Sequence, residues 1–330
     1  MKSLHEFESF FEKEMMPDLQ LLDDRRKAIV KRSMMVILFS ILALLMLVVV
    51  YINFGKTSGD DSNLLWFIIA GVLIVVGSII AGSAWAKDKT FYTDFKTQVI
   101  ERIVKFVSPD LTYEPKNFIG SDSFQRSRIF LKNVDRYNGD DMVQGKIDKT
   151  QVWFSEVKAE YRNTTTDSKG RTKTSWHTIF KGMFFIADFN KHFQTSTVVL
   201  PNRLGKGFLA SFFNKMNLAR REKHVRLEDP DFNKHFVVYG EDQVEARYVL
   251  STSLIRRITE FKIKHPNPLY ISFVNSFLYV GIAYKKDLFE PSYFKKLTRF
   301  SLVKEFFEDI HLAISIVEEL NLNNRIWTKQ

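Results

Sequence analysis

The chain has 330 residues, a formal net charge of +10 and no cysteine. The absence of cysteine excludes disulfides, thiolate metal sites and cysteine nucleophiles. The excess of basic residues favours an acidic partner, either an anionic membrane surface or a nucleic acid. No nucleic acid is expected, because the chain carries no recognised nucleic-acid-binding fold or motif.

Residues 1–33 are expected to form a cytoplasmic amphipathic helical segment. Phe7, Phe10, Phe11 and Met15 recur at helical spacing among glutamates, which predicts a helix with one apolar side. Pro17 suits the first turn of a further helix, which would run on into the apolar sequence that follows.

Two uncharged runs predict a pair of transmembrane helices, the first over residues 34–54 and the second over residues 64–86. At a rise of about 1.5 Å per residue, each run matches a hydrocarbon core roughly 30 Å thick. A buried helix of a soluble protein is the alternative, which two such runs so close together disfavour. A cleavable signal peptide is not expected either, because the residues before the first run are mostly polar.

The flanking charges predict the orientation of this hairpin. Basic residues stand before the first run and after the second, whereas the short external loop at residues 55–63 has one lysine against two aspartates. By the positive-inside rule, both termini are expected in the cytoplasm, with the chain as a multi-pass membrane protein. The flanking basic residues are Arg25, Arg26, Lys27, Lys31, Arg32, Lys87 and Lys89.

Two further features concern how the membrane part packs. Gly71, Ser78 and Gly82 lie near one stripe of the second run, where another backbone can approach closely. We prefer packing within the hairpin over a dimer seam as the use of this stripe. Residues 87–110 predict an amphipathic stalk helix that packs on the N-terminal helix, the alternative being that it lies in the membrane interface.

Residues 111–330 are expected to form a cytoplasmic α+β domain, so that the fold class is membrane-anchored α+β: a transmembrane helical hairpin plus a mixed domain with antiparallel hairpins and a long C-terminal helix. Residues 151–162 alternate, with Trp153 and Val157 on one face and Glu156 and Lys158 on the other. A second strand resumes near residue 176 after a long mobile loop at 163–175. Helices are expected over 242–265 and 293–320, and a hairpin around Asn275 and Ser276.

The string DFNKHF occurs twice, at residues 188–193 and 231–236. Each copy has two phenylalanines four residues apart, which predicts one capped helical turn clamped by a phenylalanine pair before a strand. A metal site that joins His192 and His235 to the aspartates is the alternative. Each histidine would lie off the phenylalanine stripe and no further ligands are evident, so a structural role is preferred and no metal is expected.

No catalytic motif, phosphate-binding loop or dinucleotide fingerprint occurs, so no catalytic residue and no cofactor are assigned. The NGDDM sequence at residues 138–142 resembles a calcium loop only in its first letters, and we expect a turn there. The densest charged group is a candidate polar cluster, which is either a capped helix N-terminus or an acid–base pair. It comprises Glu241, Asp242, Glu245 and Arg247.

Residues 202–226 are strongly basic and carry a short phenylalanine-rich face. Such a piece can lie on anionic lipid, each basic residue adding about 1 kcal/mol. The alternative is a helix whose phenylalanines pack on the domain and whose charges are solvated. The candidate lipid- or phosphate-binding residues are Arg203, Lys206, Lys215, Arg220, Arg221, Lys223 and Arg226.

Several blocks, including FKGMFFIADFNKHFQTSTVVLP, EDPDFNKHFVVYGEDQVEARYVL, LFEP and VEELNLNNRIWTK, resemble a bacterial family of two-pass membrane proteins catalogued as domain of unknown function 3137. The resemblance spans most of residues 90–330. It implies a membrane location with a large cytoplasmic domain, and it supplies neither an activity nor catalytic residues.

These observations favour a non-enzymatic membrane protein whose cytoplasmic module binds a protein or an anionic lipid headgroup. One rival is a membrane-bound enzyme acting on a lipid or phosphate-bearing substrate, using the candidate polar cluster with the basic residues of 202–226. Another is an accessory subunit of a larger membrane complex. The expected partners are therefore membrane lipids, with a membrane-protein partner or a second copy of the chain as further candidates.

Overall fold

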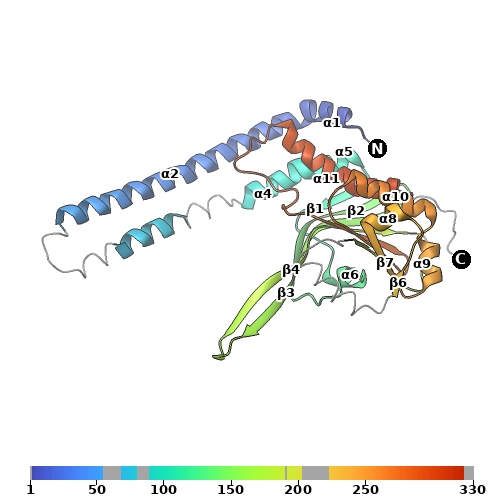
Figure 1. Ribbon diagram of the computed structural model, residues 1–330. Helices are drawn as coiled ribbons and strands as arrows, with labels where there is room; N and C mark the ends of the chain where they lie inside the picture. Colours follow the sequence, from blue (N-terminus) through green and yellow to red (C-terminus); the bar gives the residue numbers. More distant parts are fainter. Residues whose placement is uncertain (1, 55–67, 80–88, 190–191, 203–222, 323–330) are drawn as a thin grey trace. The chain divides into compact units, whose positions relative to one another are not determined.

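The computed structural model describes residues 2–54, 68–79, 89–189, 192–202 and 223–322 (Figure 1). They form two compact units. The helical unit comprises Lys2–Ile100 and Glu290–Lys304, and the sheet unit comprises Glu101–Phe289 and Glu305–Gln330. The chain thus combines a long apolar helix near its N-terminus with an antiparallel sheet-and-helix domain.

The helical unit begins with α1 (Leu4–Phe10), a π-helical turn η1 (Phe11–Met15) and α2 (Met16–Phe54). Ser3 and Glu6 form a reciprocal capping box at the start of α1. The predicted apolar side is confirmed, since Phe7, Phe11 and Met15 are buried. The new helix predicted to start at Pro17 is wrong, because the chain is helical without a break from Leu4 through the π-helical turn η1 into α2, so that Pro17 lies inside a continuous helical run.

The apolar part of α2 differs from its polar first half. Among the described residues, one helical run, Leu4–Val49, is long and apolar enough to cross a membrane, and none of its most apolar window is buried. An apolar helix at Ile68–Ile79 is shorter. The remainder of the second predicted span, residues 64–67 and 80–86, lies outside the described residues, as does Gly82.

The two apolar helices touch at Gly71. A Cβ atom added to Gly71 would lie 2.9 Å from Cδ1 of Leu44 in α2, so a side chain at residue 71 would require Leu44 to shift. This close approach matches the preferred use of the small-residue stripe, packing within the hairpin. Ser78 is half-buried and donates to the carbonyl of Ile74 at 2.7 Å within its own helix.

The rest of the helical unit includes α4 (Lys89–Phe95), the π-helical turn η3 (Lys96–Ile100) and the non-helical segment 290–299. Arg25 of α2 and Asp94 of α4 form an ion pair of 2.5 Å, which confirms that the stalk packs on the N-terminal helix. Lys96 is buried and pairs with Glu290 at 3.0 Å. Buried charges of this kind are stable only when paired.

Asp23 ties segment 290–299 to α2. Its carboxylate accepts the N–H of Leu297 at 2.9 Å and pairs with Arg26, which also donates to the carbonyl of Tyr293 at 2.6 Å. Burial raises the pKa of Asp23, but Arg26 and the Leu297 N–H outweigh burial and lower it. Residues 293–299 form turns rather than a helix, so the predicted helix over 293–320 is wrong at its start, and α11 is Phe300–Glu319.

The sheet unit contains one antiparallel sheet with the strand order β1-β2-β3-β4-β9-β8-β5-β7-β6. The strands are β1 (Leu111–Glu114), β2 (Arg136–Ile147), β3 (Thr150–Thr166), β4 (Thr172–Asp188), β5 (Thr197–Pro201), β6 (Lys223–Val225), β7 (Phe236–Gly240), β8 (Leu269–Val274) and β9 (Phe277–Ala283). The helices of this unit are α5 (Glu101–Val107), α6 (Ser121–Arg126), α8 (Pro230–His235), α9 (Gln243–Val249), α10 (Thr252–Lys264) and most of α11.

The two faces of the sheet are covered unequally. α10 and α11 lie over one face and the six-residue α6 lies over the other (Figure 1). The predicted phase of Phe180, Phe184 and Ile186 is confirmed, because all three belong to the core cluster on the α6 face, together with Phe124 of α6. We call the side of the sheet under α6 the α6 face, and the side under α10 and α11 the helix-covered face.

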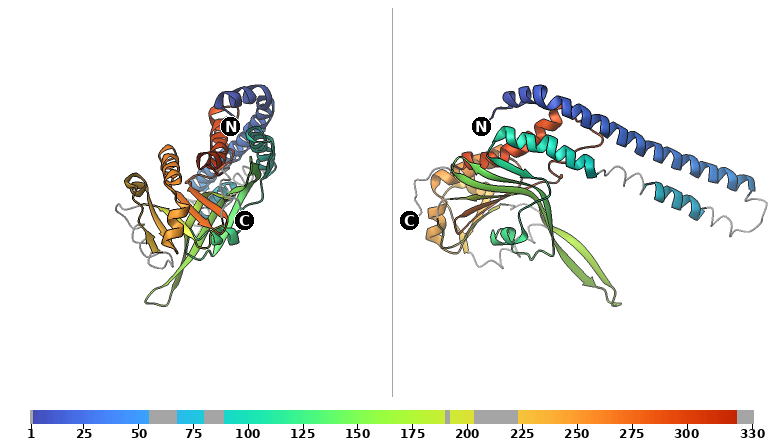
Figure 2. Two further views of the ribbon diagram at one scale, coloured as in Figure 1. Left: turned by 90° about the vertical axis from the view of Figure 1, so that its right-hand side faces the viewer. Right: turned by 180° about the vertical axis from the view of Figure 1, so that it is seen from behind.

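Two expectations about loops and helices are wrong. The long loop at 163–175 is instead the outer part of a β3–β4 hairpin that extends beyond the other strands (Figures 1 and 2). A tight turn closes it, in which Asp167 accepts the N–H groups of Lys169 and Arg171 and Gly170 has a φ of 77°. The single helix over 242–265 is two helices, since Leu250 leaves the helical region between α9 and α10.

Candidate functional site

A cavity of about 410 Å³ opens on the α6 face of the sheet. Its walls come from α6 and the residues before it, and from β2, β3, β4, β9 and the β8–β9 turn. The volume falls within the range of pockets that hold small ligands in proteins. The lining residues are Ile119, Gly120, Ser123, Arg126, Met142, Trp153, Ile186, Asn275, Phe277 and Tyr279.

The floor of this pocket is an apolar row across three strands. Trp153 of β3 is the register partner of Ile186 in β4, which is in turn the partner of Tyr279 in β9. Side chains directly opposite in neighbouring strands share one face, so the three stand side by side. Phe277 continues the row, with its ring centroid 6.4 Å from Trp153 and 6.3 Å from Tyr279.

The polar groups of the pocket lie on α6 and on the β8–β9 turn. Arg126 is exposed, and its guanidinium donates to Ser123 Oγ at 2.8 Å. Within the described residues no carboxylate pairs with Arg126. Burial raises the pKa of Tyr279, and the positive charge of Arg126 partly opposes this rise. The Arg126 guanidinium is therefore close enough to interact electrostatically with Tyr279, which is part of the apolar row.

Hydrogen bonds to the sheet fix the short helix α6 over its face. The N–H of Ile119 donates to Ser155 Oγ in β3 at 3.0 Å. At the other end, the Ser272 hydroxyl of β8 donates to the carbonyl of Ser127 at 2.5 Å. Phe124 fills the space between, stacked on Phe130 with centroids 5.1 Å apart. α6 is therefore a rigid wall of the pocket, although a helix of six residues is marginal alone.

Glu156 is the most perturbed acid of the sheet unit. It lies on the helix-covered face, is 7% exposed, and accepts the N–H of Leu288 at 2.5 Å. Burial raises the pKa of Glu156 to about 7, against the opposing effect of the Leu288 N–H, and the charges of Asp140 and Asp287 add to the rise. Two acids of the charged face predicted for residues 151–162, Glu156 and Glu160, are thus buried.

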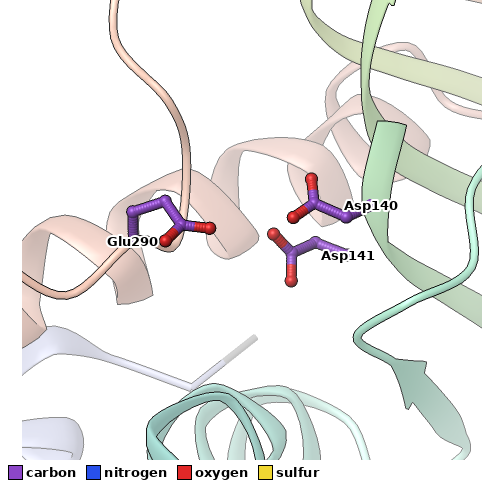
Figure 3. A group of neighbouring side chains, drawn as sticks. All are labelled: Asp140, Asp141 and Glu290. Carbon is purple, nitrogen blue, oxygen red and sulfur yellow. The ribbon is translucent and has the colours of Figure 1, made fainter. Parts of the chain in front are cut away.

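Asp140 and Asp141 project from β2 (Figure 3). The expected turn is wrong, because these residues form a bulge inside a strand, with Asp141 at a φ of 59°. Asp141 is buried and accepts a hydrogen bond from the Tyr113 hydroxyl. Two carboxylates do not make a metal site by themselves. Glu290, also labelled in Figure 3, belongs to the helical unit, where Lys96 is its partner.

The candidate polar cluster holds a loop in place. Glu245 accepts the N–H of Gln194 and of Thr195, each at 2.8 Å, and also the Thr195 hydroxyl. Asp242 is the N-cap of α9 and accepts the Glu245 N–H at 2.7 Å. Glu241 pairs with Arg128 at 2.5 Å. The carboxylates of Glu241, Asp242 and Glu245 thus accept hydrogen bonds that hold the loop and the start of α9. These contacts match the capped-helix interpretation rather than the acid–base pair.

The remaining residues of the cluster and the basic group are spread apart. Arg247 is exposed and reaches the carbonyl of Arg226 at 3.5 Å. Lys223 and Arg226 are exposed at β6 and just after it. Arg203, Lys206, Lys215, Arg220 and Arg221 lie outside the described residues.

The two DFNKHF copies differ in structure. The second is a capped helical turn, as predicted: Asp229 accepts the N–H of Phe232 at 2.9 Å, and the rings of Phe232 and Phe236 are 5.0 Å apart. In the first, Phe189 and Phe193 also stack, at 5.5 Å, but the Phe193 N–H donates to the carbonyl of Asn275. Residues 190 and 191 of the first copy, on which the predicted helical turn falls, lie outside the described residues. Among the described residues, no group with metal-binding spacing contains His192 or His235.

The sequence interpretation missed the pocket because it assigned no element between residues 115 and 137. The signal available was Gly120, followed by acidic Asp122 in the first turn and basic Arg126 in the last turn of a short segment. That charge order complements a helix dipole. Nothing in the sequence alone, however, indicates that this helix leaves part of the sheet uncovered.

A match to a known protein family extends over the C-terminal part of the chain, most of which belongs to the sheet unit. Residues 178–322 match the model of a family described as protein of unknown function (DUF3137), which confirms the resemblance over that stretch and leaves residues 90–177 outside it. No curated protein matches the chain. Among solved structures, the crystal structure of the mycobacterial trehalose monomycolate transport factor A, TtfA, is similar with a TM-score of 0.33 and 10% identity, covering 67% of this chain and 95% of that chain. At this TM-score the likeness carries no information about function.

Proposed function

We propose that this protein is a membrane-anchored binding protein, in which a transmembrane hairpin holds the sheet unit at the cytoplasmic side of a bacterial inner membrane. The hairpin comprises residues 34–54 and 64–86. The sheet unit acts as a non-enzymatic binding module for a membrane lipid or a membrane-protein partner.

The exposure of the apolar half of α2 carries this proposal. Met34, Leu38, Phe39 and Met46 are between 56% and 73% exposed, whereas Leu19 and Leu22 of the same helix are buried. A soluble protein rarely exposes a continuous apolar surface of this extent, and lipid tails would cover it. A core helix of a soluble protein would instead be mostly buried.

The packing of the N-terminal residues argues against a removable signal sequence. Asp23 and Arg26 hold the segment 290–299 through a backbone N–H and a backbone carbonyl. Cleavage after the apolar run would remove the buried partner of Leu297 and expose the apolar residues packed around it. The close approach of Gly71 to Leu44 supports a second span that returns beside the first.

Cysteine labelling tests the topology directly, because the natural chain has no cysteine. Three variants of the full chain carry one cysteine each: Ser3→Cys at the N-terminus, Ser58→Cys between the apolar runs and Lys169→Cys at the β3–β4 turn. In intact spheroplasts, a membrane-impermeant maleimide should label only the Ser58→Cys variant. After permeabilisation it should label all three.

Other patterns contradict specific parts of the proposal. External labelling of the Lys169→Cys variant but not of the Ser3→Cys variant would mean that the sheet unit is outside and that the chain spans the membrane once. Labelling of none of the three before permeabilisation, together with release of the protein by carbonate, would remove the membrane anchor altogether.

A further inference from the structure

We infer that the pocket on the α6 face binds a single-chain anionic amphiphile, with its acyl chain on the apolar row and its carboxylate or phosphate on Arg126. The inference rests on the proposed function in that it names a ligand for the same binding module. It adds a ligand class and a defined site, neither of which the family match supplies.

The lining selects an apolar, elongated ligand. Met142, Trp153, Ile186 and Tyr279 come from β2, β3, β4 and β9, which are successive neighbours in the sheet. With strands about 4.8 Å apart, this lining extends for roughly 14 Å. A row of that length is longer than a single aromatic ring needs, and it suits an extended hydrocarbon chain. Methionine and aromatic side chains accommodate such a chain without fixed polar contacts.

The charge at the rim selects an anion. Among the described residues that line the pocket, Arg126 is the one with a cationic side chain and none carries a carboxylate. Its guanidinium offers several N–H donors in a fork that fits a carboxylate or a phosphate. Ser123 and Asn275 add two polar side chains to the same lining. A neutral head group would offer the Arg126 guanidinium no negative charge to pair with.

The rim of the pocket has free space beside Gly120. Gly120 forms part of the rim, and a Cβ atom added there would meet nothing within 4 Å. Its φ of −63° and ψ of 153° are accessible to any residue, so backbone strain does not require glycine at this position. A larger side chain at residue 120 is therefore expected to occupy pocket space without disturbing the backbone.

The experiment uses the full chain in nanodiscs of uncharged phosphatidylcholine, with 9,10-dibromostearate as the probe. Bromine quenches tryptophan fluorescence on contact, and Trp153 forms part of the apolar row. The difference between the natural chain and the Trp153→Phe variant isolates the signal of Trp153 from the other tryptophans and from probe dissolved in the bilayer. We expect saturable quenching of Trp153 by dibromostearate and much weaker quenching by its methyl ester, which has the same chain and no charge.

Two pairs of variants test the two halves of the site. Arg126→Gln should weaken dibromostearate binding roughly tenfold, the loss typical of a hydrogen-bonded ion pair, and leave the methyl ester unaffected. Arg171→Gln, which removes the same charge from the hairpin turn, should change neither. Gly120→Leu should abolish saturable quenching, whereas Gly120→Ser should retain it.

The outcomes distinguish a phosphate head group from a carboxylate, and they include results that would contradict the inference. A dibrominated lysophosphatidate that quenches Trp153 more tightly than the fatty acid assigns the head group as phosphate, and the reverse assigns it as carboxylate. Equal effects of Arg126→Gln and Arg171→Gln, or of Gly120→Leu and Gly120→Ser, would overturn the inference. Cysteine labelling is independent of the ligand, so the topology can hold while the pocket assignment fails.

Discussion

Trp153 and Phe154 are neighbours in β3, yet they meet very different surroundings because they face opposite sides of the same sheet. Phe154 is fully buried on the helix-covered face, stacked on Phe185 at 6.3 Å. Trp153 is half-buried on the α6 face and borders an open pocket. Long amphipathic helices fill one face completely, whereas a six-residue helix leaves space that a ligand can use. In this domain, therefore, the stability and the binding capacity lie on separate faces of one sheet.

The largest expected effect is on the free energy of unfolding, and it should differ between alanine variants of these two neighbours. Phe154→Ala should lower the free energy of unfolding by about 3–5 kcal/mol, because it leaves a cavity in a packed core. Trp153→Ala should cost clearly less, since its ring already borders a cavity. Urea titrations of the full chain in detergent, followed by circular dichroism, measure both changes. Equal losses in the two variants would contradict the separation of the faces.

The second prediction concerns the buried acid of the helix-covered face. The pKa of Glu156 is raised to about 7 from an ordinary value of 4.5, so between these pH values the folded protein retains a proton that the unfolded chain has released. Stability should therefore fall as the pH rises from about 4.5 to about 7, by up to roughly 3 kcal/mol, and this contribution should level off above that window.

Glu156→Gln removes this titration while it keeps an acceptor for the Leu288 N–H. Its unfolding free energy should depend less on pH across the window than that of the natural chain. Glu228→Gln, at an exposed position, serves as the control. If the Glu156→Gln variant follows the same pH curve as this control, Glu156 is ionised in the fold at neutral pH.

The third prediction concerns Gly182, which lies in β4 beside β9. A Cβ atom there would lie 2.2 Å from the carbonyl oxygen of Ile282, and the φ of 147° disfavours any other residue. Gly182→Ala should cost roughly 1–3 kcal/mol through overpacking and strain. Gly170→Ala, in the hairpin turn, is the control, because its φ is also positive but no atom lies within 4 Å of the added Cβ. A loss of stability no larger than in this control would mean that β9 shifts at residue 282 to make room for the added Cβ atom.

The comparison of faces also explains how far the sequence could predict this fold. The period of two in β3 and β4 is a local property, so the phase of Phe180, Phe184 and Ile186 was predictable. The burial of Glu156 was not, because a single strand pattern does not reveal that helices distant in the sequence cover its charged face. The two DFNKHF copies make the same point: Phe232 of the second copy lies in a capped turn, whereas the N–H groups of Phe189 and Phe193 in the first copy donate to the β8–β9 turn.

The candidate site was less predictable than the fold. The polar cluster at Glu241–Arg247 stood out in the sequence for its charge density, and its acids hold backbone N–H groups of residues 194–196. The pocket instead depends on ordinary residues such as Ile186 and Tyr279, whose role arises from cross-strand register. A search for rare residue types does not find a site built in this way.

The smallest effect is expected at the rim of the pocket, where the open face can be changed without damage. Gly120 is the N-cap of α6 and offers no side chain to its first N–H groups. Gly120→Ser should stabilise the fold by a few tenths of a kcal/mol, because the hydroxyl can accept one of these N–H groups. The measurement is the same urea titration, and Gly120→Ala, which adds a Cβ atom without an acceptor, is the control. A loss of stability in the Gly120→Ser variant would show that the rim is as tightly packed as the opposite face, and the contrast between Trp153 and Phe154 would then not extend to α6.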